Sequence, residues 1–230
     1  MTYHTDGFEI RPLLSGVDVA ELCSVITNQL DRVACALLKP YAETAPDAGL
    51  EERIEHIALK DRSFAGLLGD AIATDAYQHP TAMRLAKDSR LLAVAESVTG
   101  APVAAKTIRF RYSSSALAGK RQGWHSDVAR MDGSACSKTH CAIWIPLSDA
   151  GIATGGLEIA RGKWGSPLAH DAIPGAFVIS DTDRELQQAE KICPIVPAGH
   201  GLFIDRFTPH RALENVSGKT RWSFVIWMQE

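Results

Sequence analysis

The chain has 230 residues, of which 46% are hydrophobic and 22% are charged, as is usual for a soluble globular protein. A formal net charge of −3 gives no electrostatic reason to expect nucleic acid or an anionic membrane as a partner. The five cysteines form no C-x-x-C pair, no signal-peptide pattern opens the sequence, and no stretch of 18 apolar residues occurs. We therefore expect free thiols, no membrane span and a cytoplasmic location.

Helical patterns come first along the chain. Apolar residues recur at three- and four-residue intervals over residues 18–38, which predicts an amphipathic helix. A second helix is expected from about residue 50 to 73. A third begins at Pro80, a residue suited to a first helical turn, and ends before Gly100, which is suited to a C-terminal cap.

After Gly100 the pattern changes to short segments rich in β-branched and aromatic residues, which predict strands. Turns containing Gly, Pro, Asn and Ser separate these segments, as in antiparallel sandwiches and barrels. We expect a mainly β fold with the helices packed on one outer face. No linker-like stretch divides the chain, so we expect one domain over residues 1–230. The predicted strands cover residues 103–112, 139–145, 156–160, 176–180, 192–196, 201–205, 210–214 and 220–227.

The stretch G-W-H-S-D-V places His125 and Asp127 two residues apart. In a strand, both side chains would point the same way and could meet at one metal ion. With 8 His and 27 acidic residues in 230, chance alone supplies about one such triplet, and His4-Thr5-Asp6 is a second. Two histidines and one carboxylate suit non-haem Fe(II) and leave three coordination positions open. The metal hypothesis therefore requires a second histidine from another strand.

His210 is the strongest candidate for that second histidine, because it follows a predicted strand and turn. The residues after it are typical of a β-hairpin about residues 216–219. If that loop holds four residues, Asn215 pairs with Thr220, Arg221 pairs across from Glu214, and His210 and Arg221 face the same side. Arg221, leaning back along the strand, would then grip the far carboxylate of a short dicarboxylate chelated to the metal.

Three segments, W-H-S-D, C-A-I-W-I-P-L-S-D-A-G-I-A-T-G-G-L-E-I-A-R-G and G-L-F-I-D-R-F-T-P-H-R-A-L-E-N-V-S-G-K-T-R, resemble the phytanoyl-CoA dioxygenase family. That family consists of Fe(II)- and 2-oxoglutarate-dependent oxygenases with a double-stranded β-helix (jelly-roll) core. The similarity runs from about residue 101 to 228. It implies a jelly-roll core over residues 101–230 behind a helix-rich part at residues 1–100.

The resemblance also implies the cofactors and the residues that hold them. The cofactors are Fe(II), the cosubstrate 2-oxoglutarate and O2. The iron ligands would be His125, Asp127 and His210. Arg221 would bind the outer carboxylate of 2-oxoglutarate, and the resemblance places three more residues beside the cosubstrate, namely Ser223, Trp144 and Thr107.

The implied reaction is hydroxylation, or a related oxidation, of a C–H bond in a small molecule, coupled to decarboxylation of 2-oxoglutarate to succinate and CO2. Asp127 is retained where halogenases of this superfamily have a small residue, which disfavours chlorination. Relatives often read P-G-S-H after the G-G-L strand, whereas this chain has A-R-G-K-W-G, so the substrate class does not transfer. A slight preference for an anionic substrate comes from the basic residues between 106 and 130, which are Lys106, Arg109, Arg111, Lys120, Arg121 and Arg130.

Two other functions stay open at this point. One is a cupin-like metal enzyme that does not use 2-oxoglutarate, and the other is a non-catalytic binding module. The Ser- and Gly-rich residues 113–123 predict a mobile lid over the substrate. His170 is interpreted as a surface or capping group.

Overall fold

The computed structural model describes residues 2–38, 44–75, 79–117, 122–127, 139–173 and 176–229. The predicted first helix is confirmed as α2, which begins with a capping box between Ser15 and Asp18. None of the helices in this described part combines the length and apolarity that a bilayer crossing requires. The helices are α1 (Tyr3–Asp6), α2 (Gly16–Ala36), α3 (Leu50–Lys60), α4 (Arg62–Asp75), α5 (Pro80–Ala86), α6 (Ser89–Thr99) and α7 (Arg184–Gln188).

Two of the predicted helices are each divided in two. The helix expected over residues 50–73 breaks at Asp61, whose backbone is extended and whose carboxylate accepts a hydrogen bond from the N–H of Phe64. The helix expected after Pro80 breaks at Asp88, which caps α6 in the same way. In both places an aspartate offers a competing local hydrogen bond, which ends one helix and starts the next.

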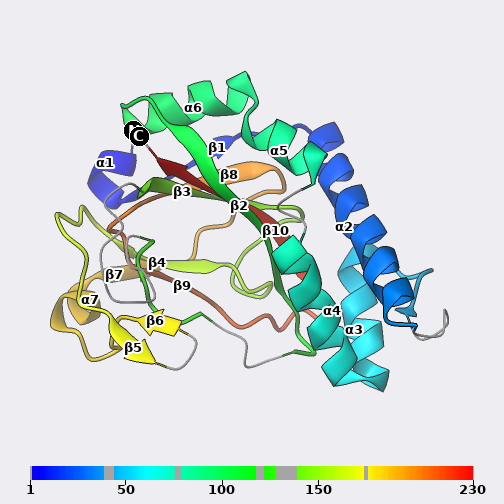
Figure 1. The fold of residues 1–230 in the computed structure, drawn as a ribbon. Coiled ribbons are helices and arrows are strands. Elements are labelled where there is room, and N and C mark those ends of the chain that lie inside the picture. The colour runs from blue at the N-terminus through cyan, green and yellow to red at the C-terminus, as the bar shows by residue number, and fades with distance from the viewer. Residues whose placement is uncertain are drawn as a thin grey trace.

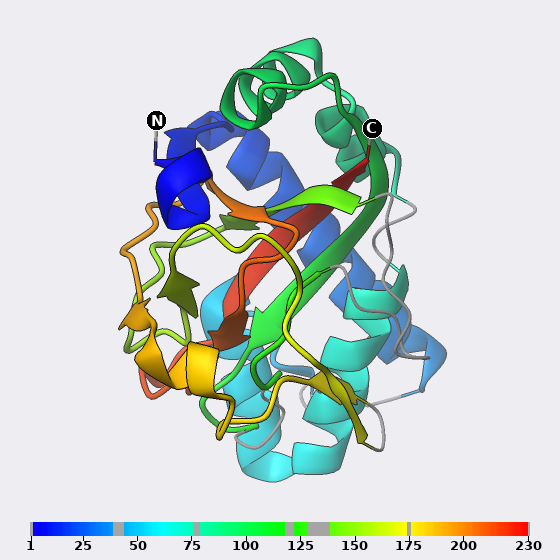
Figure 2. The same ribbon diagram turned by 90° about the vertical axis from the view of Figure 1, so that its left-hand side faces the viewer.

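The strands form two main antiparallel sheets (Figures 1 and 2). The five-stranded sheet has the order β1-β8-β3-β10-β2, and the three-stranded sheet has the order β7-β4-β9. A two-stranded ribbon, β5-β6, completes the set. The strands are β1 (Phe8–Pro12), β2 (Ala104–Ser113), β3 (Thr139–Pro146), β4 (Leu157–Arg161), β5 (Asp171–Ile173), β6 (Ala176–Val178), β7 (Glu190–Ile192), β8 (His200–Asp205), β9 (His210–Ala212) and β10 (Arg221–Gln229).

The two faces of the five-stranded sheet have different neighbours. Its outer face packs against the helices in the largest hydrophobic core, to which β10 contributes Trp222, Phe224 and Ile226. Figure 1 shows α2 to α6 along this side of the molecule, so the predicted helical layer on one face is confirmed. The inner face packs against the smaller sheet, where Trp144 and Val225 belong to a second core.

The predicted hairpin between residues 210 and 224 is wrong. β9 pairs with β4 in the small sheet, whereas β10 pairs with β2 and β3 in the large one. The chain between them crosses from one sheet to the other, and Asn215 holds the crossing by donating from its side chain to the carbonyls of Ser113 and Lys219. Arg221 accordingly lies opposite Ser113, and not Glu214.

An edge strand of the large sheet was not predicted, and one predicted strand is only partly formed. β1 was not expected, and it forms the edge of the large sheet by pairing with β8. The strand expected over residues 192–196 is realised as β7, which ends at Ile192, and as an isolated bridge between Ala150 and Val196. Cys193 and Pro194 lie between them, and proline cannot donate a ladder hydrogen bond.

The described part of the predicted lid is fastened to the body of the protein. The buried carboxylate of Glu55 on α3 accepts hydrogen bonds from the backbone N–H groups of Ser115 and Ala116 and from the hydroxyl of Thr220. These bonds tie the end of β2 to the start of β10. A lid is therefore not supported at residues 113–117, and residues 118–121 of the predicted lid lie outside the described residues.

Candidate metal centre and its cavity

His125 and His210 face each other across an isolated antiparallel bridge. The N–H of His125 donates to the carbonyl of His210 at 3.0 Å, and the N–H of His210 donates back at 2.9 Å. This reciprocal pairing brings the two imidazole rings to a centroid separation of 4.3 Å. Two histidines that are 85 residues apart in sequence are thus held side by side by backbone bonds.

A backbone carbonyl sets the tautomer of each imidazole ring. Nδ1 of His125 lies 2.8 Å from the carbonyl of Gly123, and Nδ1 of His210 lies 3.1 Å from that of Thr208. A carbonyl oxygen only accepts, so each Nδ1 carries the proton. Each Nε2 is therefore left with a lone pair, which is the form of histidine that binds a metal.

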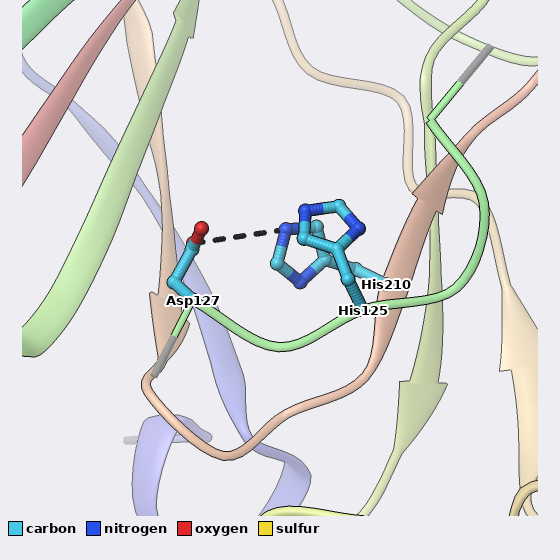
Figure 3. Close-up of side chains that lie close together, drawn as sticks. All are labelled: His125, Asp127 and His210. Atoms are coloured by element: carbon cyan, nitrogen blue, oxygen red, sulfur yellow. Dashed lines mark ion pairs between the residues drawn. The ribbon is translucent and has the colours of Figure 1, made fainter. Parts of the chain in front are cut away.

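Asp127 completes the cluster, although it follows the bridge in a turn and not in a strand (Figure 3). Its Oδ2 lies 3.7 Å from Nε2 of His210. One ligand atom from each of His125, Asp127 and His210 lies within 4.8 Å of the others, and all three side chains are buried or nearly so. The triplet His4-Thr5-Asp6 has no such role, because it lies in α1, where Asp6 pairs with Arg161.

The electrostatics of the cluster favour a neutral imidazole at His125. Burial, followed by the neighbouring His210, lowers the pKa of His125 to about 3, although Asp127 acts in the opposite direction. A proton on His125 would be buried beside a second ring that has the same need for solvation. A divalent cation at the same point would instead be stabilised by two nitrogen lone pairs and one carboxylate. The donor set therefore fits a 2-His-1-carboxylate metal ion such as Fe(II).

Arg221 is a second unusual feature of the same cavity. Its guanidinium is buried and donates to the carbonyls of Thr154 at 3.2 Å and Gly155 at 2.8 Å and to the hydroxyl of Ser223 at 3.1 Å. No described carboxylate lies within ion-pairing distance of it, and burial lowers its pKa to about 10. An uncompensated buried cation is costly, so the site fits a ligand that supplies the missing negative charge.

The backbone around Arg221 is shaped by a glycine. Gly155 has a φ of +68°, and a Cβ at this position would come within 2.5 Å of Oγ of Ser113. Only glycine adopts this conformation at low cost and leaves room for β2 beside the turn. The G-G pair of the sequence thus permits the close approach that aims two carbonyls at Arg221.

Of the three other predicted cosubstrate residues, two contact Arg221 and one lies away from the cavity. Ser223 is fully buried and bonded to Arg221, and the Trp144 ring lies under the guanidinium of Arg221, 4.9 Å from ring centroid to Cζ. Thr107 is not brought to the site. It is exposed, pairs with Trp227 at the far part of β2, and does not line the cavity.

The cavity connects the metal cluster with Arg221. It has a volume of about 280 Å³ and is lined by residues of both sheets and of α4. Besides the ligands and Arg221, its wall includes Arg111, Leu157, Ile204, Val225 and Trp227. The A-R-G-K-W-G segment is directed elsewhere, because Trp164 packs beside the third core cluster, which contains Trp124, and donates to the carbonyl of Ala160.

His170 is a residue whose position the sequence did not reveal. Its Nδ1 donates to the carbonyl of Leu168, so its Nε2 accepts the backbone N–H of Ser126 at 3.0 Å. Ser126 stands between two members of the cluster, and His170 therefore braces the turn that carries them. No local pattern links positions 126 and 170, so only the folded chain shows this contact.

The family model described as phytanoyl-CoA dioxygenase (PhyH) matches residues 19–223. No curated protein matches the chain at a significant level. Solved structures similar to this one show the same jelly-roll fold, which confirms the predicted fold class.

Three of these solved structures illustrate the likeness. The non-heme monooxygenase ThoJ has 18% identity and a TM-score of 0.63, covering 99% of this chain and 75% of that one. The epimerase SnoN, in complex with Fe3+, alpha ketoglutarate and nogalamycin RO, has 18% identity and a TM-score of 0.63, covering 100% and 81%. EctD from S. alaskensis, with 2-oxoglutarate and 5-hydroxyectoine, has 19% identity and a TM-score of 0.63, covering 99% and 73%.

Proposed function

The chain belongs to the phytanoyl-CoA dioxygenase family and is a non-haem Fe(II)/2-oxoglutarate-dependent oxygenase, and from this premise we propose that it oxidises an unactivated C–H bond of a small molecule. Hydroxylation is the reaction we favour, coupled to decarboxylation of 2-oxoglutarate to succinate and CO2. The observation that carries the proposal is the meeting, in one cavity, of a 2-His-1-carboxylate cluster and a buried arginine with no carboxylate partner among the described residues.

In the proposed site His125, Asp127 and His210 hold Fe(II), and Arg221 binds the outer carboxylate of 2-oxoglutarate. The planar guanidinium suits a carboxylate, and its bonds to Thr154, Gly155 and Ser223 fix its orientation before the cosubstrate arrives. The cupin-like alternative, which dispenses with 2-oxoglutarate, leaves this buried cation without a counter-charge.

The iron, when bound, would supply the redox chemistry that activates O2 at the expense of 2-oxoglutarate. The protein supplies positioning. The reciprocal backbone bonds between His125 and His210 and the brace from His170 hold the ligand atoms together before the metal binds. The Nδ1–H bonds keep both imidazoles in the metal-binding tautomer. Trp144 and Val225 form an apolar part of the cavity wall, which excludes water.

The proposal is tested by anaerobic addition of Fe(II) and then 2-oxoglutarate to the metal-free protein. Chelation of a keto acid to Fe(II) should give a weak charge-transfer band in the visible spectrum. We expect the band in the wild-type protein and its loss in His210→Ala, together with loss of iron retention, while circular dichroism shows that the variant is folded. Folded, iron-loaded wild-type protein that gives no band would disprove the use of 2-oxoglutarate.

The substrate is to be identified by a second measurement. Candidate small molecules are screened for those that raise succinate formation above the uncoupled background. The cavity restricts the screen to compact molecules, because its 280 Å³ must hold the cosubstrate and the reacting part of the substrate together.

A further inference from the structure

A second arginine lines the cavity, and its surroundings differ from those of Arg221. Arg111 lies on β2 directly opposite Ser223, so its side chain points to the inner face of the large sheet. It lines the cavity and is also exposed to solvent. The aromatic face of Trp227 lies under it, 6.0 Å from ring centroid to Cζ. The residues that the structure describes provide no hydrogen bond or ion pair to its guanidinium.

Several other arginines of the described chain are held by carboxylates. Arg53 pairs with Asp31 at 2.7 Å, Arg211 with Glu158 at 2.7 Å, and Arg161 with both Asp6 and Glu190. The two cavity arginines depart from this pattern. Arg221 donates to two backbone carbonyls and to the hydroxyl of Ser223, whereas Arg111 has only a ring face, which leaves its full set of N–H donors available to a ligand.

Arg111 lines the same cavity as the three residues of the metal cluster. Desolvation by the cavity wall, followed by Arg109, lowers the pKa of its guanidinium, and Asp127 raises it. Arg109 projects from the same face of the strand two residues away, is exposed, and does not line the cavity. Arg111 is thus the cation of β2 that a molecule beside the metal would meet.

The rest of the wall contains polar residues, among them Asp70 and Glu214, and an apolar part that defines the body of that molecule. Leu157, Ile204, Val225 and Trp227 present apolar surface, and the cavity volume is about 280 Å³. Resting on the proposed function, we infer that Arg111 is a substrate-recognition residue that binds the carboxylate of a small organic acid whose apolar part lies over Trp227. One guanidinium fork matches one carboxylate, which is why we choose this anion over a phosphate, for which clustered donors are the usual arrangement.

Matched neutral and charged probes test the inference. Zn(II) replaces Fe(II) so that no turnover occurs, 2-oxoglutarate is added to saturation, and binding of hexanoate and hexanamide is measured by ligand-observed NMR. The two probes share an apolar tail and differ in charge. We expect hexanoate to bind more tightly than hexanamide. Arg111→Gln should weaken hexanoate by about tenfold to a hundredfold, as for hydrogen bonds to a charged group, and leave hexanamide unchanged.

Arg109→Gln is the matched control, because it removes a cation from the same face of the same strand outside the cavity, and it should change neither probe. Equal binding of the two probes to the wild-type protein, or no binding of either, would overturn the inference. So would a tenfold loss of 2-oxoglutarate affinity in Arg111→Gln, since Arg111 would then serve the cosubstrate. Failure of 2-oxoglutarate to bind the metal-loaded wild-type protein would instead count against the proposed function.

Discussion

The two faces of β10 carry out different tasks with alternating residues of one strand. Trp222, Phe224 and Ile226 point outward into the core beneath the helices. Arg221, Ser223 and their neighbours at every second position point inward to the cavity. The outer face is uniformly apolar and closely packed. The inner face combines a buried cation, a hydroxyl and an apolar wall around empty volume.

This difference separates the residues that make the fold from those that make the site. Apolar residues on the outer face lower the free energy of the folded state by their burial. Arg221 on the inner face raises it, because a buried guanidinium has lost its hydration without gaining a counter-charge among the described residues. Substitutions on the outer face should therefore mainly lower stability, whereas substitutions on the inner face should mainly weaken ligand binding.

The largest expected effect on stability is on the outer face. Phe224 has no exposed surface and contacts Phe110 at a ring-centroid distance of 5.5 Å. Phe224→Ala should lower the free energy of unfolding by about 3–5 kcal/mol through lost burial and the cavity that remains. The measurement is urea denaturation followed by circular dichroism. Val225→Ala, the next residue on the other face, is the control and should cost less. An equal loss in both variants would show that the faces are not distinct.

The converse substitution is on the inner face. Arg221→Ala should weaken 2-oxoglutarate binding by about 2–4 kcal/mol, as for truncation of one partner of a buried charged pair. The free energy of unfolding without ligand should stay the same or rise, because an uncompensated charge is removed. Calorimetric titration of the metal-loaded variant checks the first effect and urea denaturation the second. Arg221→Lys, which keeps the charge without the fork, should lie between wild type and Ala; full retention of affinity in Arg221→Ala would contradict the assignment.

The same contrast explains how far the sequence could predict the molecule. Local patterns predict elements well, as in α2 and in the strands β3 and β8. They failed at Asp61 and Asp88, where a single side chain redirects the backbone. They also failed at β9 and β10, because short sequence separation resembles a hairpin whether or not the strands share a sheet.

The candidate site was predictable to the extent that its residues form a motif. The triplet at 125–127, His210 and Arg221 could be singled out by spacing, even though the geometry that joins them is a bridge and a sheet crossing and not the hairpin expected. Strand register brings Arg111 to the cavity, and loop packing brings His170 to the turn at Ser126. Neither placement can be seen in a local sequence pattern. Thr107 shows the converse, since a plausible alignment position lies away from the cavity.

A smaller effect is expected where a neighbour supports the site without entering it. His170→Ala removes the acceptor of the Ser126 N–H and should lower metal affinity by about tenfold, in the range found for residues that orient metal ligands. His170→Gln, whose Oε1 can replace Nε2 as acceptor, should restore most of it. His200→Ala is the matched control, because His200 also contacts a carbonyl two residues earlier but lies away from the cluster. The readout is competition for Zn(II) with a chromophoric chelator; equal affinities in all three variants would refute the brace.

The smallest effect is a pH dependence that comes from His125 in the metal cluster. His125 has its pKa lowered to about 3 in the folded protein, whereas the unfolded chain takes up a proton near the ordinary value of about 6.5. Above that value His125 is neutral in both states and contributes nothing. Between the two values the unfolded state binds more protons, so the free energy of unfolding falls as the pH falls.

In metal-free protein this linkage should lower the free energy of unfolding by about 1 kcal/mol between pH 7 and pH 5.5. Urea denaturation at the two pH values measures it, and His125→Asn should reduce the difference by that amount. Half-buried His170, whose pKa is also lowered by desolvation, keeps a contribution of the same sign in that variant. Saturating Zn(II) should raise stability at both pH values and by more at pH 7, because the metal competes with the proton for the same lone pairs. A pH difference that is unchanged in His125→Asn would show that His125 is not held in its neutral form.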